Sequence, residues 1–174
     1  MTAVVLVGLM GAGKSSVGSV VAARMGVTFV DVDVAIVGGT GKTVRELWEQ
    51  GGEPAYRYLE SKVVLDTLAE ERDVVLAAPG GVVLDPAVRA ALADAFVVWL
   101  RTDPATLASR VRLDDHRPLL GAHPRDVLTT MEHERSGVYE GLADLVIDTD
   151  HEDVETIAGR IVRALDDRTS PGRP

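Results

Sequence analysis

The sequence contains no cysteine. This absence excludes a disulfide framework, a thiolate metal site and a cysteine nucleophile, and it fits a reducing cytoplasm. Long apolar runs are absent too, because stretches such as Val4 to Met10 fall far short of the roughly 20 residues that span a membrane. The chain starts without the basic region of a signal peptide and runs straight into a glycine loop. We therefore expect a cytoplasmic protein that has no membrane partner.

Clusters of basic residues are also scarce. The chain has three lysines, and its formal net charge is −9. Nucleic acids are held by clustered Lys and Arg, so this balance opposes nucleic-acid binding and favours a small-molecule partner. An anionic ligand is compatible with the charge if a few cations are concentrated in a cleft.

The chain does contain a regular alternation of apolar runs and helical patterns, over 174 residues of which 46% are hydrophobic. This length suits one core, and the alternation is typical of a parallel sheet covered by helices. We predict an α/β fold, a three-layer α/β/α sandwich with a five-stranded parallel sheet, as one domain over 1–166 with a disordered tail over 167–174. The predicted strands, buried on both faces, are Val4 to Val7, Thr28 to Asp31, Val74 to Ala77, Phe96 to Leu100 and Leu145 to Ile147.

Local signals mark three helix starts. Thr43 to Glu46 is a capping box, and Asp85-Pro86 and Asp103-Pro104 each place an acid before a proline at the first helical position. Between two later helical patterns, the segment 112–124 contains two aspartates, two prolines and a glycine. These residues interrupt a helix, so we expect a mobile lid there.

The strongest motif follows the first predicted strand. Gly8 to Ser15 satisfies G-x-x-x-x-G-K-[ST] between a strand and a helix, which is the pattern of a phosphate-binding loop, or P-loop. Lys14 would bridge the β- and γ-phosphates of a nucleotide, and the Ser15 hydroxyl would ligate Mg²⁺. Backbone N–H groups and the helix start would wrap the phosphates, so the predicted ATP-binding residues of the loop are Gly11, Ala12, Gly13, Lys14, Ser15 and Ser16. The alternative is a glycine-rich turn that only joins strand to helix, which the Lys-Ser pair disfavours.

Several classes of protein share this loop. GTPase switches read guanine with an asparagine, and this chain contains none. The chain is short for a motor or transporter ATPase. A nucleotide kinase similar to adenylate kinase, and a switch that binds ATP or GTP without any acceptor, remain open. We favour a kinase that phosphorylates a hydroxyl group of a small metabolite.

Two acids follow the second predicted strand. Asp31 and Asp33 lie at the carboxyl edge of the sheet, where ligands of open α/β folds bind. In an extended stretch, residues i and i+2 point the same way, so both carboxylates would face the P-loop. One would hold metal-bound water and the other would meet an acceptor hydroxyl. The third strand ends without an acid, so the metal side falls to Asp31. The alternatives are exposed turn acids or a helix N-cap.

Six fragments together resemble the shikimate kinase family. They are GLMGAGKSS from Gly8, the triplet Asp31-Val32-Asp33, GEPAYRYLE at 52–60, the glycine pair at 80 and 81, RPLL at 117–120, and Arg135 with Tyr139. Their order and spacing match the family over about residues 3–165. The resemblance implies a five-stranded P-loop kinase that uses ATP and Mg²⁺ to phosphorylate the 3-hydroxyl of shikimate in aromatic amino-acid biosynthesis. We expect a monomer.

The resemblance also implies roles for single residues on the acceptor side. Asp33 becomes the candidate base that orients the attacking hydroxyl. Arg57 and Arg135 match two arginines that grip the substrate carboxylate, for which a planar guanidinium is well suited. Gly80 and Gly81 would give the substrate close access to the backbone. The alternative for both arginines is an ordinary surface ion pair.

On the nucleotide side, the resemblance makes Lys14 the phosphate clamp and places Ser15 and Asp31 beside Mg²⁺. Arg117, in the predicted lid, would close over the phosphates and stabilise the charge that develops during transfer. Arg110 would lie against the adenine, with Asp148 to Asp153 on the other side. The alternative for Arg117 is a charge that keeps a loop soluble.

Three positions depart from the family. The chain carries Pro79 where the family has the first of three glycines, and proline removes a backbone donor. Trp48 and Tyr56 stand at two wall positions that are usually phenylalanine. These changes leave the ATP side intact, so a paralogue that phosphorylates another carbocyclic or sugar acid is the alternative.

Overall fold

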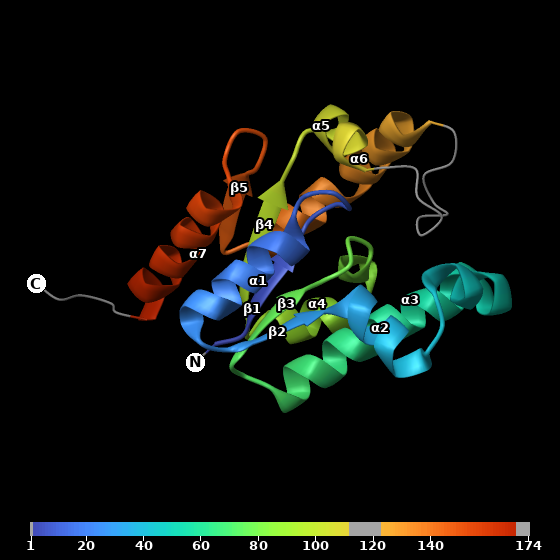
Figure 1. Cartoon of the computed structure of the whole chain (residues 1–174), viewed down its shortest axis with the longest axis horizontal. Helices are drawn as coiled ribbons and strands as arrows, with labels where there is room; N and C mark the ends of the chain where they lie inside the picture. The colour runs from blue at the N-terminus through green and yellow to red at the C-terminus, as the bar shows by residue number, and fades with distance from the viewer. Residues whose placement is uncertain (1, 112–122, 170–174) are drawn as a thin grey trace, which may run out of the picture.

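A computed structural model of the protein describes residues 2–111 and 123–169 (Figure 1). Within these residues, five strands form one parallel sheet in the order β2-β3-β1-β4-β5. All five predicted strands are confirmed. The last two each run one residue further than predicted, because Arg101 and Asp148 pair in register and their side chains form an ion pair. The strands are β1 (Val4–Val7), β2 (Thr28–Asp31), β3 (Val74–Ala77), β4 (Phe96–Arg101) and β5 (Leu145–Asp148).

Helices cover both faces of this sheet and confirm the three layers. Helices α1 and α7 pack against each other on one face, while α3, α4 and part of α6 lie on the other (Figure 1). The helices are α1 (Lys14–Met25), α2 (Val32–Thr40), α3 (Val44–Glu70), α4 (Pro86–Leu92), α5 (Pro104–Arg110), α6 (Pro124–Leu142) and α7 (Val154–Thr169), with a short 3₁₀ turn η1 (Val82–Leu84). In this part of the chain, no helix combines the length and apolar character that a membrane crossing requires.

The three predicted helix starts are confirmed by their hydrogen bonds. The Glu46 N–H donates to Thr43 Oγ1 at 3.2 Å, and the Thr43 N–H donates to Glu46 Oε2 at 2.7 Å. Asp85 and Asp103 each accept a bond from the backbone two residues later. Local sequence therefore fixes where α3, α4 and α5 begin.

Burial differs between the centre and the edges of the sheet. Strands β1 and β3 are buried along their whole length, as is β4 up to Leu100. The edge strands β2 and β5 are partly exposed, so the prediction of burial on both faces holds only for the central strands. An edge strand has a neighbour on one side only, and less of it is covered.

The predicted lid and the predicted tail each overlap a helix at one end. The lid was predicted over 112–124, of which 112–122 lie outside the described residues; Pro124 already belongs to α6 as its first residue. The predicted tail over 167–174 begins too early, because α7 continues to Thr169. Its last turn is held by Arg168, whose guanidinium contacts Asp144 at 2.9 Å and lies 5.4 Å from the ring centre of Phe96.

Replacement by alanine should have opposite effects on stability at two helical glycines, because only the one in α1 is packed closely against the sheet. A Cβ at Gly18 would lie 2.5 Å from Phe29 Cε2 and 3.2 Å from Leu6 Cδ1. We expect Gly18→Ala to lower the free energy of unfolding by about 1 to 3 kcal/mol through overpacking. At Gly137, in α6, a Cβ would meet no described atom within 4 Å. Gly137→Ala should therefore raise the free energy of unfolding by about 0.4 to 1 kcal/mol. Urea denaturation of both variants checks this, and shifts of the same sign would contradict it.

Candidate active site

A cavity of about 330 Å³ lies at the carboxyl ends of β1, β2 and β3. Ligands of open α/β sheets bind at this edge, because the loops that leave the strands converge there. The predicted site residues that line the cavity are Gly11, Gly13, Lys14, Ser15, Ser16, Asp31, Asp33, Arg57, Gly80, Gly81, Arg110 and Arg135. Ala12, in the same loop, is buried, and Arg117 lies outside the described residues.

The P-loop connects β1 to α1 through backbone that only glycine adopts easily. Gly8 has φ 138°, and a Cβ there would lie 2.5 Å from the carbonyl oxygen of Leu100. Lys14 folds over the loop, and its Nζ donates to the carbonyls of Gly8 at 2.8 Å and Leu9 at 2.9 Å. Gly13 begins α1 without a side-chain cap, so the backbone N–H groups of the first turn can serve an anion. This arrangement is suited to a polyphosphate.

Asp31 and Ser15 form the oxygen-donor pair that was predicted for the metal. The Ser15 hydroxyl donates to Asp31 Oδ2 at 2.5 Å. Carboxylate and hydroxyl oxygens are ligands that suit Mg²⁺, which also keeps waters and takes phosphate oxygens. The described residues contain no group of three or more acids or histidines that could hold a metal ion unaided. The pair therefore fits a Mg²⁺ ion that a nucleotide phosphate would share.

The local structure around Asp33 corrects one step of the sequence argument. The chain does not stay extended after Asp31; instead Asp31 caps α2, and its Oδ1 accepts hydrogen bonds from the N–H groups of Asp33 and Val34. Asp33 thus lies in the first turn of a helix, and the N-cap alternative is right for Asp31. The two carboxylates line the same cavity because the cap turns the chain, and not because residues i and i+2 alternate along a strand.

Arg57 is held in the cavity wall by two acids of its own helix. Its Nη1 contacts Glu60 Oε2 at 2.7 Å, and its Nη2 contacts Glu53 Oε1 at 3.2 Å. Glu60 is 2% exposed. Burial raises the pKa of the Glu60 carboxyl, and the adjacent Arg57 opposes that shift. Glu60 is not among the residues predicted for the site, although its spacing of three residues from Arg57 on a helix was the available signal.

Arg135 reaches the same cavity from α6. Arg135 is 7% exposed, and its buried Nε has no hydrogen-bond partner among the described residues. A buried guanidinium with a donor to spare is suited to an anionic ligand. Burial raises the pKa of the neighbouring Tyr139 to about 12, against the opposing charge of Arg135. The Tyr139 hydroxyl donates to the carbonyl of Gly80 at 2.6 Å, which ties α6 to the loop after β3.

The glycine pair is needed for contacts within the protein. A Cβ at Gly80 would lie 3.0 Å from the Gly8 carbonyl oxygen, and a Cβ at Gly81 would lie 2.7 Å from Arg57 Nη1. The loop therefore packs directly on the P-loop and on Arg57. Pro79 is buried beside them, and its carbonyl accepts a bond from the Val82 N–H at 3.2 Å.

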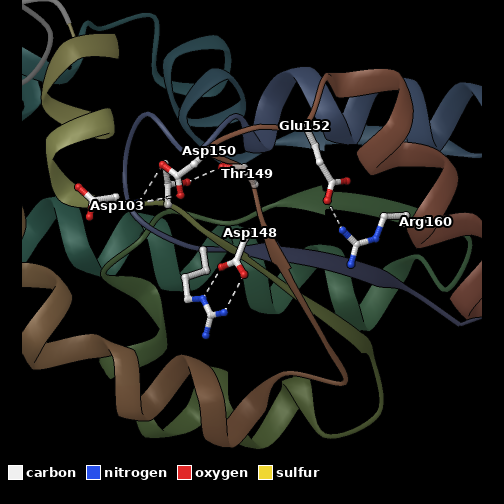
Figure 2. Close-up of polar contacts among 8 residues, drawn as sticks. Asp103, Asp148, Thr149, Asp150, Glu152 and Arg160 are labelled. Carbon is white, nitrogen blue, oxygen red and sulfur yellow. Dashed lines mark hydrogen bonds and ion pairs between the residues drawn. The ribbon is translucent and has the colours of Figure 1, made fainter.

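Arg110 lies against the loop after β5. The guanidinium of Arg110 donates to the carbonyl of Thr149 at 2.9 Å. Figure 2 shows that the acids around Thr149 have partners of their own. Asp150 accepts a bond from the Asp103 N–H, and Glu152 forms an ion pair with Arg160. Arg110 is thus fixed to the loop that was predicted to lie across the adenine from it.

Comparison with known proteins gives consistent matches to one family. The family model "Shikimate kinase" matches residues 10–166. The shikimate kinase of Chromobacterium violaceum is 43% identical over 171 residues, covering 97% of this chain and 91% of the relative. That of Thermobifida fusca is 42% identical, covering 92% and 93%. Among solved structures, shikimate kinase from Acinetobacter baumannii in complex with shikimate is 30% identical, with a TM-score of 0.92 and coverage of 97% of this chain and 94% of that one.

The two acids on Arg57 predict unequal effects on stability. Glu60→Gln should lower the free energy of unfolding by about 3 kcal/mol, the low end for one partner of a buried ion pair, because the Arg57 side chain keeps partial contact with water. Glu53 is half exposed, so Glu53→Gln is the matched control and should cost less than about 1 kcal/mol. Urea denaturation measures both values, and an equal or larger loss in Glu53→Gln would contradict the assignment.

Proposed function

The chain belongs to the shikimate kinase family, and we propose that its cavity transfers the γ-phosphate of ATP to the 3-hydroxyl of shikimate through the residues described above. It is an ATP-dependent phosphotransferase with an alcohol acceptor. The observation that supports the proposed site is that one cavity combines a P-loop with two arginines and the Asp33 carboxylate. Family membership sets aside the GTPase, nucleotide-kinase and non-catalytic alternatives.

ATP is assigned to the P-loop side of the cavity. The backbone of Gly11 to Gly13 and the start of α1 would surround the phosphates, and Lys14 would exchange its two carbonyl partners for phosphate oxygens. Arg110 would lie against the adenine. Ser15 and Asp31 would hold Mg²⁺, which when bound neutralises charge on the phosphates. That Arg117 closes over the phosphates stays a prediction.

Shikimate is assigned to the side that carries the arginines. Arg57 and Arg135 would bind its carboxylate, with Arg57 oriented by Glu60. The Asp33 carboxylate would accept a hydrogen bond from the 3-hydroxyl, aim its oxygen at the γ-phosphorus and take its proton. A new O–P bond forms as the bond from the γ-phosphorus to the bridging oxygen of ADP breaks. Positioning and charge stabilisation supply most of the catalysis in such a transfer. Action as a monomer in the cytoplasm stays a prediction.

A coupled assay of ADP release tests this function, and Lys14→Met tests the site. We expect ADP release by the unmodified protein to depend on shikimate. Lys14→Met should abolish it while circular dichroism stays unchanged, because the cost falls on charge in the transition state. Near-normal turnover in a folded Lys14→Met protein would contradict the assignment of the P-loop. Shikimate-independent ADP release would contradict the acceptor.

Asn substitutions at the two aspartates should separate metal binding from acceptor activation. Asp33→Asn should cut kcat by about 10²- to 10⁴-fold with little change in the KM for ATP, since its partner is the acceptor hydroxyl. Asp31→Asn should instead raise the Mg²⁺ concentration needed for half-maximal activity. Titration of Mg²⁺ with each variant checks the division, and identical responses would refute it.

A further inference from the structure

The Asp33 carboxylate is already engaged by a second residue of the cavity wall. The Tyr56 hydroxyl, from α3, donates to Asp33 Oδ1 at 2.9 Å. Among the described residues, the Asp33 side chain accepts this one hydrogen bond. The contact joins α3 to the first turn of α2 in the wall of the cavity, which both residues line.

The Tyr56 side chain is fixed more firmly than its partner. Tyr56 is 4% exposed, whereas Asp33 is exposed. Its ring lies 6.2 Å from that of Trp48, on the other side of the bend that Gly52 makes in α3 with φ 69°. Burial and the neighbouring Asp33 charge raise the pKa of the Tyr56 hydroxyl, so it keeps its proton and acts as a donor. The hydroxyl is therefore a buried donor aimed at an exposed carboxylate.

We propose that Tyr56 is a positioning residue for the transfer, which holds Asp33 through Oδ1 and leaves Oδ2 free for the acceptor hydroxyl. This inference rests on the proposed function, because it needs Asp33 to be the group that meets the acceptor. Tyr56 itself touches neither the reacting phosphorus nor the attacking oxygen. It acts by limiting the orientations of the group that does.

The physical reason lies in the torsions of an aspartate side chain. Rotation about the bond that carries the carboxylate has a broad, shallow profile, so an exposed Asp33 would present its oxygens in many directions. Transfer needs the attacking oxygen held near its target in a narrow geometry. One hydrogen bond from a rigid ring removes most of that freedom. The gain is made in the transition state, and it should be seen in kcat more than in binding.

Tyr56→Phe removes one oxygen atom and tests the proposal directly. We expect kcat with shikimate to fall about tenfold, while the KM for ATP and the KM for shikimate change by less than about twofold. Tyr58→Phe is the matched control: it is the same change two residues later in α3, at a side chain that is 67% exposed. Its kcat should equal that of the parent, and the two variants should have similar melting temperatures. A loss shown mainly as raised KM values, with kcat kept, would overturn the proposal and point to a purely structural role.

A second measurement asks whether Tyr56 acts through Asp33. The test compares Asp33→Ala with the double variant Asp33→Ala/Tyr56→Phe and follows the residual transfer with radiolabelled ATP. Without the Asp33 carboxylate, the Tyr56 hydroxyl has no partner to hold, so Tyr56→Phe should change the residual rate by less than about twofold. A further tenfold loss in that background would overturn the proposal.

The parent protein separates failure of this inference from failure of the proposed function. A parent without shikimate-dependent ADP release overturns both. An active parent, with Tyr56→Phe at the same kcat, overturns the positioning role alone and leaves the kinase assignment intact.

Discussion

The Asp31 carboxylate is the contact on which the site depends most. Its Oδ1 caps α2, and its Oδ2 accepts the Ser15 hydroxyl, so one side chain ends a strand, starts a helix and ties both to the P-loop. Because the cap turns the chain at once, Asp33 falls in the first helical turn, where the Tyr56 hydroxyl reaches it. An Asp31 that only ended a strand would leave the Asp33 carboxylate without a defined place.

The arginines show how an acidic chain can accept anionic ligands. The net charge is −9, yet Arg57 and Arg135 line one cavity together with Lys14 and Arg110. Positive charge gathered in a cleft acts at short range, where solvent screens it least, and the overall field matters less there. Glu60 stabilises Arg57 in the wall and Gly81 leaves space for its guanidinium, so that arginine is fixed before any substrate arrives.

The loop after β3 gives a physical account of Pro79, the departure from the family pattern. The Ala78 N–H bonds to the Leu6 carbonyl, and the Pro79 carbonyl accepts from Val82, so the backbone is held on both sides of the missing N–H. Gly80 and Gly81 are the positions where a side chain would collide with Gly8 and Arg57. Proline at 79 is therefore compatible with this loop and restricts its φ, which favours a stiffer turn over a changed acceptor.

By itself the sequence determined the strands, the capped helix starts and the P-loop. These features are local, because apolar runs, caps and glycine turns act over a few neighbouring residues. The arginines of the cavity were expected there only through the resemblance to the family, because they come from separate helices. Tertiary structure decided the contacts between distant segments: Tyr56 with Asp33, 23 residues apart, and Tyr139 with Gly80, 59 residues apart. It also decided the burial of Glu60 and the length of α7, which Arg168 extends by contacting Asp144 and Phe96. Such contacts depend on which faces of distant elements pack together, and the local spacing of residues along the chain does not reveal those faces.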